Sequence, residues 1–393
     1  MTVRDRDLRI VATAIAISAI GDWVAMIALS LRANELWKGA GVAVLLICLW
    51  SPLAALAGYV GLLVDRLETR SLAIWSALFQ AGIATALAFA HTLMAILPLT
   101  ILLGIGVAVS QASEFALVPL LAGSRQIGRA NGLVESMRAI GFMVGPLIGG
   151  VLAAAAGIQL ALFADAATFL VIAGVLASLP VRRRVAQPDG PKPRARDGLQ
   201  LLGSERVLAI VLGAGAVTLV FMSASIPGDF AYVTELGYQK FGIGIVLSAW
   251  AIGMMIASNT IPQRIPAHAV ALVTLLAATL QGLAKFTAPF WPVFPFMVGC
   301  WLIGGAGHGL KNTGFRTLIH QRVDADHHGR AFAAFNGLRN TAELVALAGG
   351  GVLVTTLGAR GTLWIAGGVS ALAGIGGAFA LSASRRHRRA VLD

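Results

Sequence analysis

The sequence predicts an all-α integral membrane protein in which twelve transmembrane helices form two similar six-helix halves. The first observation is composition: 57% of the 393 residues are hydrophobic and only 12% are charged, with a mean hydropathy of +0.81. Soluble domains carry about twice that share of charged residues. The second is a dozen apolar stretches, each close to the roughly 20 residues that a helix needs to span a bilayer. The third is a pattern that returns after half the chain.

The predicted helices follow one another with short connections. We expect them near residues 9–31, 40–64, 71–90, 95–121, 132–156, 159–180, 205–227, 241–262, 268–287, 293–315, 332–357 and 362–383. This assignment divides the chain into an N-terminal half (1–180), a basic cytoplasmic linker (181–204), a C-terminal half (205–384) and a basic cytoplasmic tail (385–393). Four Pro and Gly residues within 188–193 argue against a continuous helix in the linker.

The repeat indicates that both halves follow one plan. Gly128-Arg129-Ala130 returns as Gly329-Arg330-Ala331, Arg138 as Arg339, and Gly149-Gly150 as Gly350-Gly351, each 201 residues later. Parallel repeats of this kind occur in secondary transporters whose substrate site lies between the repeats. The repeat therefore predicts a transport protein.

The positions of the basic residues predict the orientation. If both termini are cytoplasmic, 22 of the 30 Lys and Arg residues lie on the inner side, five on the outer side, and three within helices. The five outer residues are Arg32, Lys38, Lys240, Lys285 and Arg360. An excess of bases in short inner loops is the usual topology signal. We therefore expect a bacterial inner-membrane protein with both termini in the cytoplasm. The net charge of +12 is explained by topology and anionic headgroups, without nucleic acid as a partner.

Metal and cofactor sites are not expected. Cys48 and Cys300 lie in apolar runs of different halves, which is unlike a disulfide framework or a Cys-based metal site. His327 and His328 lie in a basic inner turn, where a solvated loop is the better interpretation. The first helix is too long for a cleaved signal peptide, so we expect it to stay as an anchor. No phosphate-binding loop or hydrolase motif is present, and we predict that the protein is not an enzyme.

The helix predicted at 132–156 carries a stripe of glycines. Gly141, Gly145 and Gly149 are four residues apart, a step that drifts only about 40° around a helix, so they share one face. Gly132 lies about half a turn out of phase with that stripe. Small residues let membrane helices approach closely, and Pro146 favours a bend within the run. The stripe is therefore either a packing seam or a bending element.

Several ionisable residues lie inside predicted helices, where such groups usually face a cavity or a partner. Asp22 is a candidate for binding a cationic substrate or a proton, and structural pairing with a neighbouring helix is its alternative. Glu114, Lys311 and His308 are further candidates, with permanent pairing or simple hydrogen bonding as alternatives. For Asp165 we favour packing.

Two of these patterns resemble signatures of the major facilitator superfamily. Gly61, Asp65, Arg66 and Arg70 resemble its first cytoplasmic loop signature, although Glu68 replaces a glycine and Thr69 a base. The run from Gly132 through Gly141, Gly145-Pro146 and Gly149 resembles the signature of its drug–proton antiporters. Residues 312–339 resemble a bacterial efflux subgroup that includes macrolide and siderophore exporters. The resemblance covers essentially the whole chain and implies the twelve-helix transporter fold.

The resemblance also implies roles for the candidate residues. Helices one, four, seven and ten line the cavity in that family, which would place Asp22, Glu114 and Lys311 beside it and Asp229 near its outer mouth. Glu114 and Lys311 could pair in the empty cavity and part when substrate or a proton arrives, with Glu114 as proton carrier. The fourth helix lacks the intramembrane arginine that such antiporters often carry. The inner gate would comprise Gly61, Asp65, Arg66, Arg70, Arg138 and Arg339.

These features together favour a secondary active transporter that exports small amphipathic or cationic molecules, driven by protons. The expected partners are a small-molecule substrate, protons and the lipid bilayer, with a monomer as the expected state. An importer of a nutrient or metabolite on the same fold is one alternative. A membrane receptor or assembly factor that moves nothing is the other.

Overall fold

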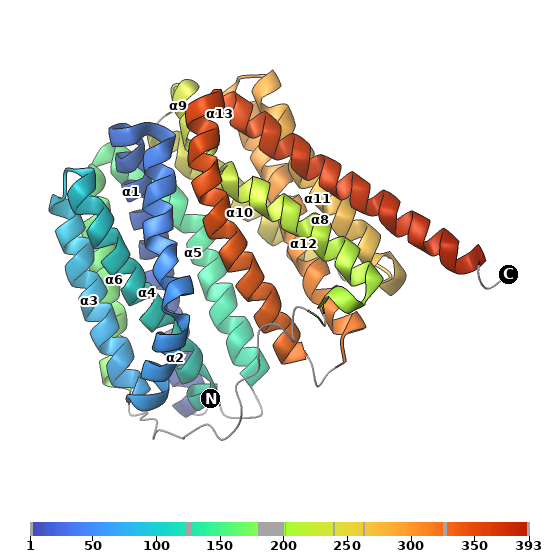
Figure 1. Cartoon of the computed structure of the whole chain (residues 1–393). Coiled ribbons are helices and arrows are strands. Elements are labelled where there is room, and N and C mark those ends of the chain that lie inside the picture. Colours follow the sequence, from blue (N-terminus) through green and yellow to red (C-terminus); the bar gives the residue numbers. More distant parts are fainter. Residues whose placement is uncertain are drawn as a thin grey trace. The chain divides into compact units, whose positions relative to one another are not determined.

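The computed structural model describes residues 3–122, 127–179, 200, 202–238, 240–261, 264–324 and 328–390. In these ranges the regular structure consists of α-helices and two short 3₁₀ helices, with no strand (Figure 1). The all-α prediction is therefore confirmed over the described residues.

The chain forms two compact units. The first comprises residues 1–189 and 238–248, and the second comprises residues 190–237 and 249–393. The first contains α1 (Val3–Ala55), α2 (Ala57–Arg66), α3 (Thr69–Phe89), α4 (Leu93–Ala122), α5 (Ile127–Ala155), α6 (Ile158–Ser178) and the start of α10 (Lys240–Thr260). The second contains α8 (Arg206–Ala224), α9 (Ile226–Glu235), the rest of α10, η2 (Ala267–Ala269), α11 (Val270–Thr287), η3 (Ala288–Phe290), α12 (Phe294–Arg322) and α13 (His328–Ala390).

Nine helical segments among the described residues are long and apolar enough to cross a membrane. One of them, Gly337–Ser384, has the length of two spans and is broken at Gly358, whose φ of 71° lies in the left-handed region. Figure 1 shows this break as a sharp bend in α13. The shorter apolar helix Ala40–Ala55 and the glycine-rich α12 account for the remaining predicted spans. The twelve-helix prediction is consistent with this arrangement.

Two predicted boundaries differ from the structure. The first two predicted spans share the single long element α1, within which Arg6–Trp37 and Ala40–Ala55 are the separate apolar segments. The predicted span 40–64 is also interrupted at Leu56, after which α2 begins.

Matched close contacts in the two units support the repeat. A Cβ atom at Gly104 would lie 2.2 Å from the carbonyl oxygen of Leu49, and one at Gly305 would lie 2.0 Å from that of Trp250. Both members of the second pair lie 201 residues after those of the first. Real Cβ atoms essentially never come within 3.0 Å of another heavy atom, so glycine is required where these backbones meet.

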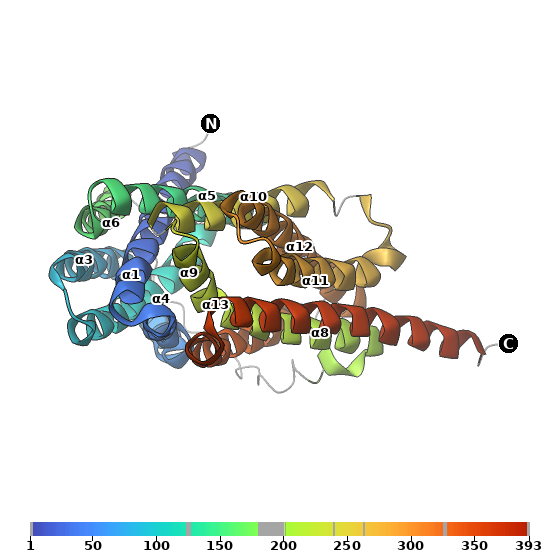
Figure 2. The same ribbon diagram turned by 90° about the horizontal axis from the view of Figure 1, so that it is seen from above.

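The exposed surfaces of the helices, outside the packed core, are apolar. Met94, Trp75 and Phe379 are 89%, 70% and 71% exposed, as expected of side chains that face lipid. Inside the second unit, Phe315, Leu318 and Leu381 belong to one buried cluster. Figures 1 and 2 both show α8 running beside the C-terminal part of α13, which closes that cluster.

Candidate functional site

The first group of charged side chains lies where α4 and α5 meet in the first unit. Arg138 of α5 donates a hydrogen bond from Nη2 to the Glu114 carboxylate of α4 at 2.5 Å. Ser110, one turn earlier on α4, donates to the other carboxylate oxygen at 3.3 Å. Glu114 is only 9% exposed. An ion pair at this depth satisfies two charges that the bilayer would otherwise penalise.

Asp22 of α1 belongs to the same group. It lies close enough to Glu114 and Arg138 to interact electrostatically with both, and its side chain remains exposed. The structure therefore brings three sequence-predicted site residues of the first unit together. Glu114 and Lys311 belong to different units, and their predicted pairing stays a prediction.

The glycine stripe of α5 determines where this part of α1 lies. A Cβ atom at Gly141 would lie 2.5 Å from that of Ala19, and one at Gly145 would lie 2.5 Å from that of Trp23. A Cβ atom at Gly149 would lie 3.0 Å from the Cα atom of Val24. Through these contacts α1 packs directly against α5 on both sides of Asp22. They favour the packing interpretation of the stripe, and bending at the buried Pro146 stays a prediction.

A further acid of the first unit was expected only to pack. Asp165 of α6 is fully buried, and neither of its carboxylate oxygens has a hydrogen-bond partner among the described residues. One of these oxygens would lie 2.7 Å from a Cβ atom at Gly21, so Asp165 packs beside the residue that precedes Asp22.

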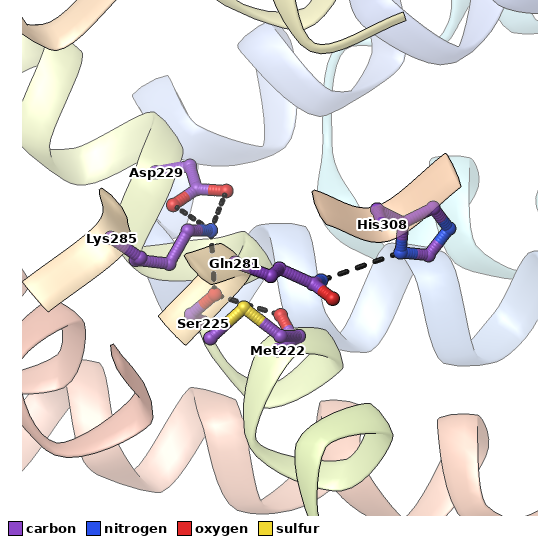
Figure 3. A network of polar contacts seen from close by, with 6 residues as sticks. All are labelled: Met222, Ser225, Asp229, Gln281, Lys285 and His308. Atoms are coloured by element: carbon purple, nitrogen blue, oxygen red, sulfur yellow. Dashed lines mark hydrogen bonds and ion pairs between the residues drawn. The ribbon is translucent and has the colours of Figure 1, made fainter. Parts of the chain in front are cut away.

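The second unit contains a buried ion pair between α9 and α11. The ammonium group of Lys285 lies 2.8 Å from both carboxylate oxygens of Asp229 and donates to Ser225 Oγ at 2.8 Å (Figure 3). It also lies 4.8 Å from the ring centroid of Trp301 and 5.7 Å from that of Trp250. Asp229 and Lys285 are 3% and 4% exposed.

The burial of Lys285 corrects its assignment to the outer side in the predicted distribution of basic residues. Its position near the end of a predicted span places it among the outer-side cations, but the structure holds it inside the helix bundle of its unit. The apolar run that surrounds it in sequence is the signal that points to this position.

His308 connects α11 and α12 beside that ion pair. Its Nδ1 lies 3.3 Å from the amide nitrogen of Gln281 and its Nε2 lies 2.8 Å from that of Asn312 (Figure 3 shows the first contact). Its ring packs against Trp250 at a centroid distance of 5.5 Å. His308 therefore has two polar partners, which supports the hydrogen-bonding alternative for its role.

A cavity of about 270 Å³ lies between α8, α12 and α13 of the second unit. Lys311 lines it and is 1% exposed. Over the described part of the chain, its ammonium group has no hydrogen-bond or salt-bridge partner. Arg339 also lines the cavity and pairs with Glu343, one turn further along α13, at 3.6 Å. The structure thus places two predicted site residues, Lys311 and Arg339, on one cavity.

Of the predicted gate residues of the first unit, Arg138 belongs to the ion pair with Glu114, whereas Arg66 and Arg70 lie elsewhere. Arg70 donates to the carbonyl groups of Leu176, at 2.8 Å, and Ala177, and so caps the end of α6. Arg66 is exposed in the last turn of α2. Glu68, the departure from the family signature, is the N-cap of α3. The surroundings of Gly61, Asp65 and Gly132, and the predicted linker up to residue 199, lie outside what the structure describes.

Comparison with known proteins gives consistent matches. The sequence profile of the Major Facilitator Superfamily matches residues 11–340 and 271–392. The MFS-type transporter YfiS of Bacillus subtilis is 25% identical over 362 residues, which cover 87% of this chain and 85% of YfiS. The multidrug efflux pump Tap of Mycobacterium tuberculosis is 24% identical over 249 residues, 60% of this chain and 58% of Tap.

Solved structures show the same fold. A structure of the nucleoside transporter NupG superposes with a TM-score of 0.77 at 13% identity, over 96% of this chain and 99% of NupG. A bacterial homologue of the human lysosomal transporter Spinster gives a TM-score of 0.74 at 14% identity, over 96% of both chains. At this identity the likeness concerns the fold alone, and it confirms the predicted fold class.

Proposed function

The chain belongs to the Major Facilitator Superfamily of transporters, and we propose that it exports small amphipathic molecules in exchange for protons. In this proposal its two units alternate in opening a central path to either side of the membrane, as in other transporters built from repeats. The contact between Glu114 and Arg138, with Asp22 nearby, is the observation that carries the proton-coupled part.

The coupling follows from the charges of this group. While Glu114 is ionised, the ion pair at 2.5 Å holds α4 against α5. A proton on Glu114 removes the negative charge and leaves Arg138 to interact with Asp22 instead. This exchange of partners gives two arrangements of the same side chains, which is what a transport cycle requires. The protonated state then favours one arrangement and the ionised state the other.

Export is supported by the relatives. Tap is named a multidrug efflux pump, and a chloramphenicol resistance protein of Streptomyces lividans is 30% identical over 158 residues, 37% of this chain. Import is the alternative direction, and transport in everted vesicles separates the two.

The test uses everted membrane vesicles that contain the full chain and carry an imposed pH gradient. A panel of amphipathic compounds, including chloramphenicol, macrolides, lipophilic cations and aromatic carboxylates, is added while a pH-sensitive dye reports the gradient. We expect at least one compound to accumulate inside the vesicles and to dissipate the gradient. In Glu114→Gln both effects should fall to the level of vesicles without the protein, because the amide neither takes up a proton nor forms the ion pair.

Glu235→Gln is the matched control, since it removes an exposed carboxylate that pairs with Arg360 at 3.4 Å. It should transport like the wild type. Dissipation that persists in Glu114→Gln would exclude Glu114 as the proton carrier. Compound uptake in right-side-out vesicles alone would establish import instead.

A further inference from the structure

The second unit contains two buried lysines with opposite surroundings. Lys285 has two carboxylate oxygens, a hydroxyl group and two aromatic rings around its ammonium group. Lys311 is buried more deeply, at 1% exposure, and over the described residues its ammonium group lacks a hydrogen-bond or salt-bridge partner. Because burying an unpaired cation is costly, buried lysines are normally paired or bound to a ligand. Lys285 shows how this unit satisfies such a group, whereas no described residue does so for the ammonium group of Lys311.

The cavity supplies the space for an outside partner. Lys311 lines it together with Arg339 and Asn312, and none of its lining residues is an Asp or Glu. Glu343, the carboxylate within electrostatic range of Lys311, already pairs with Arg339 at 3.6 Å. Two cations and one nearby acid therefore leave this end of the cavity with a net positive charge.

The remaining walls are apolar. They are formed mainly by leucines and aromatic rings of the three helices: Leu212, Leu219, Phe315, Phe335 and Leu338. Its volume of about 270 Å³ lies just below the range of roughly 300–1,000 Å³ typical of small-molecule sites. A ligand that fits combines a compact apolar body with one anionic group.

We propose that this cavity is a binding site for small amphipathic anions, with the anionic group at Lys311 and Arg339. The planar guanidinium group of Arg339 suits a carboxylate, sulfonate or phosphate, and Lys311 supplies the second positive charge. Asn312 is held in place by His308 at 2.8 Å and borders the same end. The inference deepens the proposed function, on which it rests, by naming the charge of the transported molecule.

The test compares three probes that share one apolar body: 2-naphthoate, 2-naphthamide and 2-naphthylmethylammonium. Binding of each radiolabelled probe is measured at equilibrium on the purified full chain in phosphatidylcholine nanodiscs. We expect the carboxylate to bind most tightly and the ammonium compound most weakly. In Lys311→Met the carboxylate should bind about 10-fold to 100-fold more weakly, the usual effect of removing a charged hydrogen-bond donor, while the amide changes little.

Two further variants make the result specific. Arg339→Gln should also weaken binding of the carboxylate, whereas Arg264→Gln, which removes an exposed cation outside the cavity, should not. Lys311→Met should unfold at a temperature no lower than the wild type, because it removes an unpaired buried charge. Equal affinities for carboxylate and amide, or a preference for the carboxylate that survives both cavity substitutions, would overturn the proposal.

A second arm separates a soluble anion from a lipid headgroup. Nanodiscs containing phosphatidylglycerol should weaken naphthoate binding to the wild type if the site takes anionic lipid, and should leave it unchanged if the site takes soluble anions. Both results agree with an anion site, and they identify whether its ligand is a lipid headgroup or a soluble anion. Binding is measured without a gradient, so an anion preference without transport would refute the proposed function alone. Transport of compounds without such a preference would refute only the site.

Discussion

The contrast between the two units is clearest at the buried pair of Asp229 and Lys285. The residues 201 positions earlier are Ala28 and Ala84, and both are fully buried. The equivalent positions of the first unit are therefore buried without charges. It follows that the fold itself does not need an ion pair at this position.

Breaking that pair on one side should destabilise the second unit. Asp229→Ala and Lys285→Met each leave the other charge buried and unpaired, at an expected cost of about 3–5 kcal/mol. The double variant removes both charges and should recover most of this loss. Thermal unfolding of purified protein, followed by tryptophan fluorescence, measures the three variants. Single variants as stable as the wild type would show that the pair is solvated or loosely held.

A stripe of small residues acts through the whole helix that carries it. Along α5, three glycines meet the backbone of α1 over two turns, and the position of Asp22 depends on that contact. The sequence predicted the stripe from its spacing, but its partner helix appears only in the structure.

Adding one methyl group to this seam should separate α1 from α5. Gly141→Ala places its Cβ atom 2.5 Å from that of Ala19, and we expect a loss of about 1–3 kcal/mol in stability from overpacking. Gly174→Ala in α6 of the same unit is the control, since a Cβ atom there meets no atom within 4 Å. The control should gain up to about 1 kcal/mol from the higher helix propensity of alanine. Equal unfolding temperatures for both variants would contradict the packing role.

For the molecule as a whole, the two units share one plan but differ in the charges they bury. The first buries Glu114 and Asp165 near the exposed Asp22, whereas the second buries Lys311 at a cavity and a neutralised pair, Asp229 and Lys285. We interpret the acids as serving the proton and Lys311 as serving the substrate. Such a division of tasks is possible because the two repeats keep the same backbone contacts while their polar residues differ.

The orientation of the whole chain is tested with fusion proteins. With both termini in the cytoplasm, a green fluorescent protein fused after Asp393 should fluoresce, and alkaline phosphatase at the same point should be inactive. Alkaline phosphatase inserted after Gly157, in the turn between α5 and α6, should be active because the predicted orientation places that turn on the outer side. The reverse pattern would overturn the orientation and the expected direction of the proton gradient across the protein.

Sequence alone determined the class of this protein, because hydropathy and helix length follow directly from residue type. The 201-residue repeat also predicted two halves, and the glycine spacing predicted one bare face on the helix that becomes α5. Only the tertiary structure decided which charges meet. Membrane helices such as α4 and α12 are apolar on most faces, so their patterns do not show which way Glu114 or Lys311 points. Close packing fixes those directions, and it paired Glu114 with Arg138 while leaving Lys311 at a cavity.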